Sequence, residues 1–262
     1  MKMPVLFVSH GAPTLSLEPG DTGAAWRKLG KQLPKPAAIL VVSAHWETRT
    51  PTISRAVHPE TIHDFSGFPA ELYKMQYPAP GAPEMAQAAA HALQQAGKPV
   101  QLDDAHGLDH GAWVPLKLMY PKADIPVAQL SLQPDKNPAW HIEVGRALRP
   151  LREQGVLIVG SGSITHNLGE VFRHRPGTPV PAWVTEFREW MAQQVSAGDL
   201  AALGAYRSRA PHAVRNHPTD EHLLPLFVAL GAADKIDSAQ HLNQVMTYGL
   251  LAMDMWLFDA NP

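Results

Sequence analysis

The chain has no cysteine and no large excess of charge of either sign. Without cysteine it forms no disulfides and no thiolate-held zinc or iron–sulfur site, so any metal must be bound through histidine nitrogen or carboxylate oxygen. The 22 basic and 24 acidic residues give a net charge of -2, and no block of like charge occurs. This balance gives no electrostatic reason to expect nucleic acid or an anionic membrane surface as a partner.

Long apolar runs are also missing, since no segment is long enough to span a bilayer. Residues 1–13 are too short for the core of a signal peptide and lack its small-residue cleavage site. We therefore expect a cytoplasmic protein with no membrane partner. The hydrophobic content of 45% is enough to bury a sizeable core, and neither a repeat nor a linker divides the sequence. We expect a single domain that spans residues 1–262.

Short apolar runs rich in valine and isoleucine alternate with helical patterns along the chain. Strands are expected at 4–9, 38–44, 125–132 and 156–163, and helices at 22–33, 83–96, 111–119, 138–153 and 181–197. This alternation predicts an α/β fold with a mainly parallel central sheet flanked by helices on both faces. A further helix is expected to open at Thr219 as N-cap, and residues 244–258 are expected to close the sheet as an edge strand. The long loop at 46–82 is expected to be functional.

Histidine is abundant, with 14 in the chain, and three of them follow predicted strands. His10 and His45 come directly after their strands, and His166 follows the last strand within a few residues. Because the carboxyl ends of parallel strands share one edge, where ligand sites of α/β proteins lie, these imidazoles are expected to converge on a metal. Gly11, Gly160 and Gly162 would let the backbone pass close to whatever is bound at this edge. The alternative, that each histidine is an ordinary loop side chain, stays open on this pattern alone.

Glu221 and His222 form a fourth candidate at the start of the late helix. The side chains of adjacent helical residues point about 100° apart, so we do not expect Glu221 and His222 to bind the same metal together. Two alternatives remain: His222 binds the metal with Glu221 as its supporting partner, or Glu221 itself is the ligand. Such a pair also occurs without a metal, as a charge and capping interaction at the start of a helix.

Two loops carry further candidates. Asp109 precedes His110 and could orient its imidazole, and His63 lies near Phe65, with which it could line an aromatic pocket. His174 belongs to the remaining histidines, which are expected in solvent or in packing. The chain has no complete phosphate loop, nucleophile elbow, H-E-x-x-H sequence or dinucleotide fingerprint.

Several of these stretches match one known family in order along the chain. The stretches are SHGAPT, VVSAHW, TIHDFSGFP, GLDHGAW, GSGSITHNL and EHLLPL. Together they resemble the bacterial DOPA-dioxygenase-like branch of the class III (LigB-type) extradiol ring-cleavage dioxygenases. The resemblance extends from about residue 4 to about residue 230, nearly the whole chain.

The resemblance implies one α/β domain with a mononuclear non-haem metal site at the carboxyl edge of the sheet. By motif it places His10, His45, His166 and His222 at the metal and makes His110 the acid or base next to the substrate. In protocatechuate-cleaving relatives the histidine that matches His166 is a catalytic base rather than a ligand. Both roles therefore stay open for it.

The expected function is the opening of a catechol ring, with DOPA as the type substrate and O2 as co-substrate. Fe(II) is expected for turnover and Zn(II) in purified protein. His110 or His166 would take the second hydroxyl proton, because an imidazole titrates near neutral pH. His63 and Phe65 would line the substrate pocket. The alternatives are a zinc hydrolase that uses the same histidines and a non-catalytic member of the superfamily. The natural catechol, the bond cleaved, the native metal and the oligomeric state are left open by the sequence.

Overall fold

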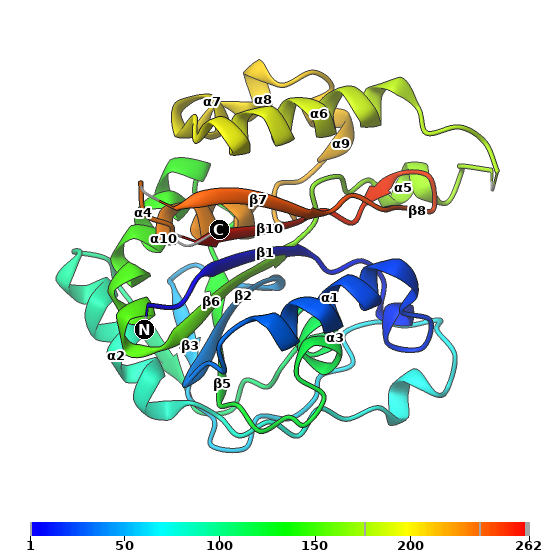
Figure 1. The fold of residues 1–262 in the computed structure, drawn as a ribbon. Coiled ribbons are helices and arrows are strands. Elements are labelled where there is room, and N and C mark those ends of the chain that lie inside the picture. Colours follow the sequence, from blue (N-terminus) through cyan, green and yellow to red (C-terminus); the bar gives the residue numbers. More distant parts are fainter. Residues whose placement is uncertain (1, 176, 236, 260–262) are drawn as a thin grey trace.

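The computed structural model describes residues 2–175, 177–235 and 237–259 (Figure 1). The strands are β1 (Val5–Ser9), β2 (Ala38–Glu47), β3 (Thr52–Ser54), β4 (Gln101–Asp103), β5 (Val127–Leu132), β6 (Val156–Gly162), β7 (Ser238–Asn243), β8 (Met246–Thr247), β9 (Leu251–Ala252) and β10 (Met255–Asp259). The α-helices are α1 (Gly20–Gln32), α2 (Pro83–Gln95), α3 (His110–Met119), α4 (Pro138–Leu148), α5 (Leu168–Val171), α6 (Ala182–Ala197), α7 (Leu200–Gly204), α8 (Tyr206–Arg209), α9 (Ala213–Asn216) and α10 (Leu224–Ala232). Short 3-10 helices are η1 (Pro13–Ser16), η2 (Leu72–Lys74) and η3 (Arg149–Gln154).

Eight strands form one sheet in the order β4-β3-β5-β2-β6-β1-β10-β7, and β8 pairs with β9 in a separate two-stranded sheet. The central strands β5, β2, β6 and β1 run parallel, because helical crossovers connect them. At one side β10 pairs antiparallel with β1 and with β7, and at the other β3 pairs antiparallel with β5. The predicted α/β fold is confirmed as a single domain around a mixed, mainly parallel sheet.

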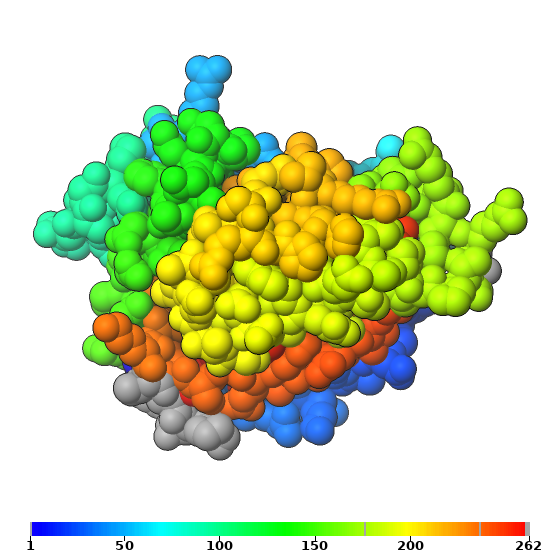
Figure 2. Space-filling model, turned by 90° about the horizontal axis from the view of Figure 1, so that it is seen from above, coloured from blue at the N-terminus to red at the C-terminus, as the bar shows by residue number. Residues whose placement is uncertain are grey.

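Both faces of the central strands β5, β2, β6 and β1 are buried, which explains why these strands read as continuous apolar runs. In β1, Val5 and Phe7 pack into the core on one face, while Leu6 and Val8 pack into the core on the other. Helices α1 and α3 lie on one side of the sheet, and α4, α10 and the α6–α9 segment lie on the other (Figure 1). Figure 2 shows that the α6–α9 segment covers the middle of that side.

The four predicted strands are present, but the ends of the sheet differ from the prediction. β2 is longer than expected and includes His45, and its pairing with β5 is irregular before Glu47. The prediction of an edge strand within residues 244–258 is wrong, because β10 pairs on both sides. The edge strand on this side of the sheet is β7, whose sequence SAQHLN is too polar to be recognised as a strand.

The late helix begins five residues after the predicted N-cap. Thr219 does not cap it, because α10 starts at Leu224 with Pro225 in its first turn. The carbonyl of His222 instead accepts a hydrogen bond from the Ser163 backbone N–H at 2.7 Å, which ties this turn to the end of β6. Proline lacks a backbone N–H and clashes with the preceding helical turn, so the first turn of a helix accommodates it best.

Two further observations concern the helices. The helix predicted at 138–153 ends at Leu148 as α4 and continues as η3, where Pro150 interrupts the α-helical hydrogen bonds. Within the described ranges, none of the helices is both long enough and apolar enough to cross a bilayer.

Candidate functional site

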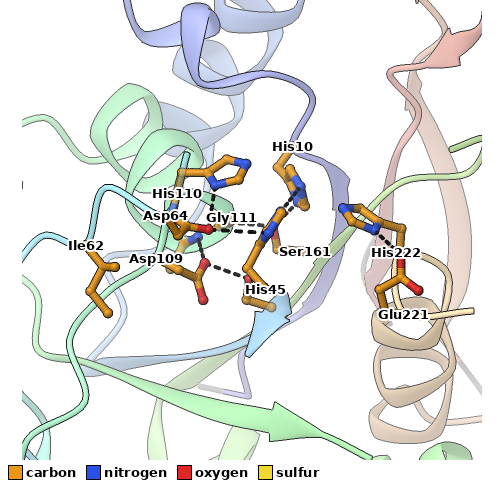
Figure 3. A network of polar contacts seen from close by, with 12 residues as sticks. His10, His45, Ile62, Asp64, Asp109, His110, Gly111, Ser161, Glu221 and His222 are labelled. Carbon is orange, nitrogen blue, oxygen red and sulfur yellow. Dashed lines mark hydrogen bonds and ion pairs between the residues drawn. The ribbon is translucent and has the colours of Figure 1, made fainter. Parts of the chain in front are cut away.

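Three histidines converge at the carboxyl edge of the sheet (Figure 3). His10 follows β1, His45 lies near the end of β2, and His222 lies in the turn before α10. One ring nitrogen from each lies within 4.8 Å of the other two. The close approach depends on glycine, because a Cβ at Gly162 would lie 2.1 Å from the carbonyl oxygen of His222. The turn that carries His222 therefore packs directly against the end of β6.

The first imidazole is oriented through its Nδ1 atom. His10 Nδ1 lies 3.0 Å from the Ser161 hydroxyl, and that hydroxyl donates its own proton to the Gly111 carbonyl. Ser161 must therefore accept from His10, so Nδ1 carries the proton and Nε2 carries the lone pair.

Carboxylates lie beside the Nδ1 atoms of the other two imidazoles. His45 Nδ1 lies 3.3 Å from Asp64 Oδ2, and His222 Nδ1 lies 2.9 Å from Glu221 Oε1. Only the second contact is a hydrogen bond, and because an ionised carboxylate only accepts, His222 Nδ1 carries the proton. This hydrogen bonding from the outer nitrogen is the pattern that fixes metal-binding histidines in proteins.

These donors suit a divalent metal. The Nε2 atoms of His10 and His45 lie 3.0 Å apart and face each other. Burial lowers the pKa of all three imidazoles, that of His45 to about 4, so the rings are neutral near pH 7. Neutral imidazole nitrogens bind iron and zinc, and three protein ligands leave coordination positions open.

His166 lies beside this group but is not part of it. Its ring stacks on the ring of His222 with centroids 3.4 Å apart, and its nearest set of possible ligands also contains Glu221. Burial, followed by the neighbouring His217, lowers the pKa of His166 to about 4. The ring is therefore neutral near pH 7 and can accept a proton.

His110 opens α3 and is held by Asp64. Its Nδ1 lies 2.8 Å from Asp64 Oδ2, and its backbone N–H donates to Asp64 Oδ1 at 2.9 Å. Burial alone would raise the pKa of Asp64, but the hydrogen bonds and charge interactions with His110, together with the charge interaction with His45, lower that pKa below its usual value. One carboxylate therefore holds both His110 and His45.

The expectation that Asp109 orients His110 is wrong. Asp109 caps α3 by accepting from the Ala112 N–H, and its two oxygens also accept from Ser43 and Gln129 at 2.7 and 2.6 Å. Its carboxylate is fully used within the protein core. Asp64 lies next to His63 in the sequence, and this adjacency was the only available signal for it.

The histidines form the floor of a cavity of about 850 Å³. His110, His166 and Phe65 line it, together with the metal-site histidines. His63 does not: its Nε2 contacts the Met75 carbonyl at 3.0 Å, and its ring lies edge-on to Phe65 with centroids 5.8 Å apart.

Two segments that the sequence analysis did not assign to the site complete the cavity wall. One is α5 with the loop after it, which contributes Phe172 and His174, and the other is the β8–β9 turn, which contributes Tyr248. The two segments touch, because a Cβ at Gly249 would lie 2.3 Å from the His174 ring. His174 had been expected in solvent or packing, since nothing in its sequence neighbourhood signals a site.

Comparison with known proteins agrees with this geometry. Residues 5–253 match the family described as the catalytic LigB subunit of aromatic ring-opening dioxygenase. The chain is 44% identical to the 4,5-DOPA dioxygenase extradiol of Escherichia coli strain K12 over 236 residues, which cover 89% of this chain and 86% of that protein. It is 41% identical over 265 residues to the protein of the same name from Beta vulgaris, with 97% and 96% of the two chains covered.

A solved structure shares the fold. The crystal structure of an uncharacterized protein from Escherichia coli K12 superimposes with a TM-score of 0.82 at 37% identity, covering 98% of this chain and 99% of that one. The family match spans nearly the whole chain and includes all the histidines of the site. The chain therefore belongs to the LigB family of aromatic ring-opening extradiol dioxygenases.

Proposed function

We propose that the protein opens the ring of a DOPA-like catechol with O2 at one divalent metal held by His10, His45 and His222. The observation that carries this proposal is the set of three neutral imidazoles, each with a polar partner beside Nδ1, that line one substrate-sized cavity. The names of the two relatives support a DOPA-like catechol.

The donor set supports Fe(II) as the metal for turnover. Fe(II) at these three ligands would supply binding of both adjacent hydroxyls and of O2 at its open positions. Zn(II) binds the same nitrogens without redox chemistry, so we expect it in purified protein but not in turnover. His222 is the ligand and Glu221 its supporting partner, because Glu221 contacts His222 through Nδ1.

We assign His166 and His110 to proton transfer. His166 is neutral, lines the cavity and lies outside the three-ligand group, so it acts as a base for a catechol hydroxyl rather than as a fourth ligand. The Nδ1 atom of His110 is held by Asp64, which leaves Nε2 to exchange a proton with the substrate.

Aromatic side chains position the substrate ring. Phe65 lies edge-on to His110 with ring centroids 5.8 Å apart and lines the cavity, so it forms a wall for the catechol. His63 supports Phe65 from behind and acts on the substrate through that ring.

Anaerobic reconstitution tests this function. Metal-free protein is loaded with Fe(II), mixed with DOPA or simpler catechols, and exposed to air while O2 uptake and the yellow ring-opened product are followed. We expect uptake and product in equal amounts, and loss of both metal and activity in His10→Ala. The matched control His91→Ala, at an exposed position on α2, should behave as wild type.

Two results would contradict the proposal. The first is tightly held zinc with no O2 uptake and with hydrolysis of ester or amide substrates, which would indicate a zinc hydrolase. The second is full metal content in His10→Ala, which would show that the ligands have been wrongly assigned.

A further inference from the structure

We propose that His174 and Tyr248 form a subsite that binds the ammonium and carboxylate groups on the side chain of a DOPA-like catechol, an inference that rests on the proposed function. The two residues come from different segments of the cavity wall, the loop after α5 and the β8–β9 turn. Neither belongs to the metal site or to the proton transfer proposed above.

The cavity has room for more than a catechol ring. Its volume of about 850 Å³ lies toward the upper end of the roughly 300–1,000 Å³ of pockets that hold drug-sized ligands. A catechol ring bound next to His10, His45 and His222 would fill a small part of it. The rest of the wall is therefore available to the ring substituent, and His174 and Tyr248 both belong to that wall.

The loop after α5 presents one nitrogen of His174 as a hydrogen-bond acceptor. The Thr178 hydroxyl donates to the Arg175 carbonyl at 2.7 Å and lies 2.9 Å from His174 Nε2. A hydroxyl has one proton to donate, so Thr178 accepts from the imidazole and Nε2 carries the proton. The neutral ring then has its lone pair on Nδ1, which can accept a hydrogen bond from a substrate ammonium group.

The β8–β9 turn packs against this imidazole. Tyr248 and Gly249 have φ angles of 51° and 69°, and the Leu250 N–H donates to the Thr247 carbonyl at 3.2 Å. Positive φ at both central residues is what a type I′ hairpin turn requires. A Cβ at Gly249 would lie 2.3 Å from His174 Nε2, so the turn and the ring are in direct contact.

Tyrosine is an unusual residue for this turn. Type I′ turns favour asparagine, aspartate or glycine, because a bulky side chain is strained at positive φ. The Tyr248 side chain is 54% exposed and lines the cavity, so burial in the core does not account for it. Residues held in strained backbone conformations cluster at ligand sites. We therefore assign this tyrosine to ligand binding.

The hydroxyl of Tyr248 is available to a ligand. It lies 3.5 Å from the Thr14 hydroxyl, which is longer than the roughly 2.5–3.0 Å of a formed O–H···O hydrogen bond. A phenol hydroxyl can donate to a carboxylate, and hydrogen bonds to charged groups are stronger than those between neutral groups. His174 Nδ1 as acceptor and the Tyr248 hydroxyl as donor therefore match the two charged groups of an amino acid.

Catechols with different side chains test the two assignments separately. DOPA carries both charged groups, dopamine only the ammonium, 3-(3,4-dihydroxyphenyl)propanoate only the carboxylate, and 4-propylcatechol neither. Dissociation constants are measured anaerobically by calorimetry on Fe(II)-loaded protein near pH 7, and kcat/KM is measured in air.

Two variants keep an aromatic ring and remove the polar group. Tyr248→Phe should weaken the binding of DOPA and of the propanoate about tenfold or more and leave dopamine and 4-propylcatechol nearly unchanged. His174→Phe should weaken DOPA and dopamine to the same degree and leave the propanoate and 4-propylcatechol nearly unchanged. The values of kcat/KM should fall for the same ligands. Tyr73→Phe and His91→Phe are the matched controls, because both residues are exposed and lie outside the cavity.

A third variant tests whether the tyrosine is kept for binding rather than for the turn. Asparagine suits the turn, so Tyr248→Asn should raise the Tm of the Fe(II)-loaded protein by about 2–4 °C, while DOPA binding weakens. A lower Tm with unchanged DOPA binding would make Tyr248 a structural residue of the turn and overturn its part in the subsite.

The outcomes separate this inference from the proposed function. Unchanged binding of all four ligands in Tyr248→Phe and His174→Phe, or an equal loss for charged and uncharged ligands, overturns the subsite whether or not the ring is cleaved. The expected binding pattern without ring cleavage overturns the proposed function and leaves the subsite standing.

Discussion

At the scale of single residues, Asp64 links the metal site to proton transfer. Its Oδ2 atom contacts the Nδ1 atoms of both His45 and His110, at 3.3 and 2.8 Å. The first of these histidines is a proposed metal ligand and the second a proposed acid or base. One carboxylate therefore orients His110 by a hydrogen bond and places its negative charge beside His45.

Replacing Asp64 by asparagine should separate orientation from metal binding. The asparagine amide has one acceptor oxygen, so it cannot accept from both imidazoles and also from the His110 backbone. We expect kcat/KM for catechol cleavage to fall about 10–100-fold, with the protein still folded. Asp104→Asn is the control, since Asp104 is exposed and pairs with Arg55 at the surface. Wild-type kinetics in Asp64→Asn would show that this carboxylate positions neither ring.

A second residue-scale prediction concerns acid stability at His141, on α4. This side chain is 1% exposed, and its Nδ1 contacts the Asn137 carbonyl at 3.0 Å. Burial lowers its pKa from 6.5 to about 4. Between these values the unfolded chain binds a proton that the folded chain does not, so the free energy of unfolding falls as the pH drops from about 6.5 to about 4.

Removing this proton site should flatten the decline. In His141→Gln the slope of unfolding free energy against pH should decrease by up to about 1.4 kcal/mol per pH unit in that window. Urea denaturation of chelator-treated protein at several pH values measures it, with exposed His91→Gln as control. Parallel profiles for wild type and His141→Gln would contradict the prediction.

At the scale of elements, β6 helps to position the site because two of its residues, Gly160 and Gly162, have no side chain. Its glycines let α10 and the turn before it approach, and a Cβ at Gly160 would lie 2.4 Å from the carbonyl oxygen of Pro225 in α10. The same turn is hydrogen bonded to β6 through Ser163 and His222. The position of His222 therefore depends on the sequence of a neighbouring strand.

Gly162→Ala should displace that turn. The added methyl group would meet the His222 carbonyl oxygen at 2.1 Å and Pro225 Cγ at 3.2 Å, neither of which is the end of a flexible side chain. We expect metal affinity to fall by about tenfold or more, measured by competition with a coloured chelator. Gly204→Ala is the control, because nothing lies within 4 Å of a Cβ there. Unchanged affinity in Gly162→Ala would show that the turn can shift without moving its imidazole.

At the scale of the whole molecule, the sequence predicts the centre better than the periphery. β1, β2, β5 and β6 are buried on both faces, so their apolar runs are visible without any structural information. The convergence of His10 and His45 then follows from parallel strand order alone.

The parts that the sequence did not predict depend on long-range contacts. β3 and β4 have three residues each, and the edge strand β7 is polar, so none shows a clear strand pattern. The contact of Asp64 with His110 joins a long loop to the start of a helix that is distant in the sequence. Nothing periodic marks α5 or the β8–β9 turn as walls of a cavity.

Because the three proposed ligands come from separate parts of the chain, metal binding should stabilise the whole fold. A metal that binds only the folded state, at a hundredfold excess over its dissociation constant, adds about 2.7 kcal/mol. For a chain of roughly this size each kcal/mol raises Tm by about 2–4 °C, so a rise of about 5–10 °C is expected on adding Fe(II) or Zn(II) to chelator-treated protein. Scanning calorimetry measures it, and His45→Ala should show little rise. If both metals stabilise the protein and only Fe(II) supports ring cleavage, the structural role of the site is separated from its redox role. A Tm that does not change with metal would contradict ligation by three separate segments.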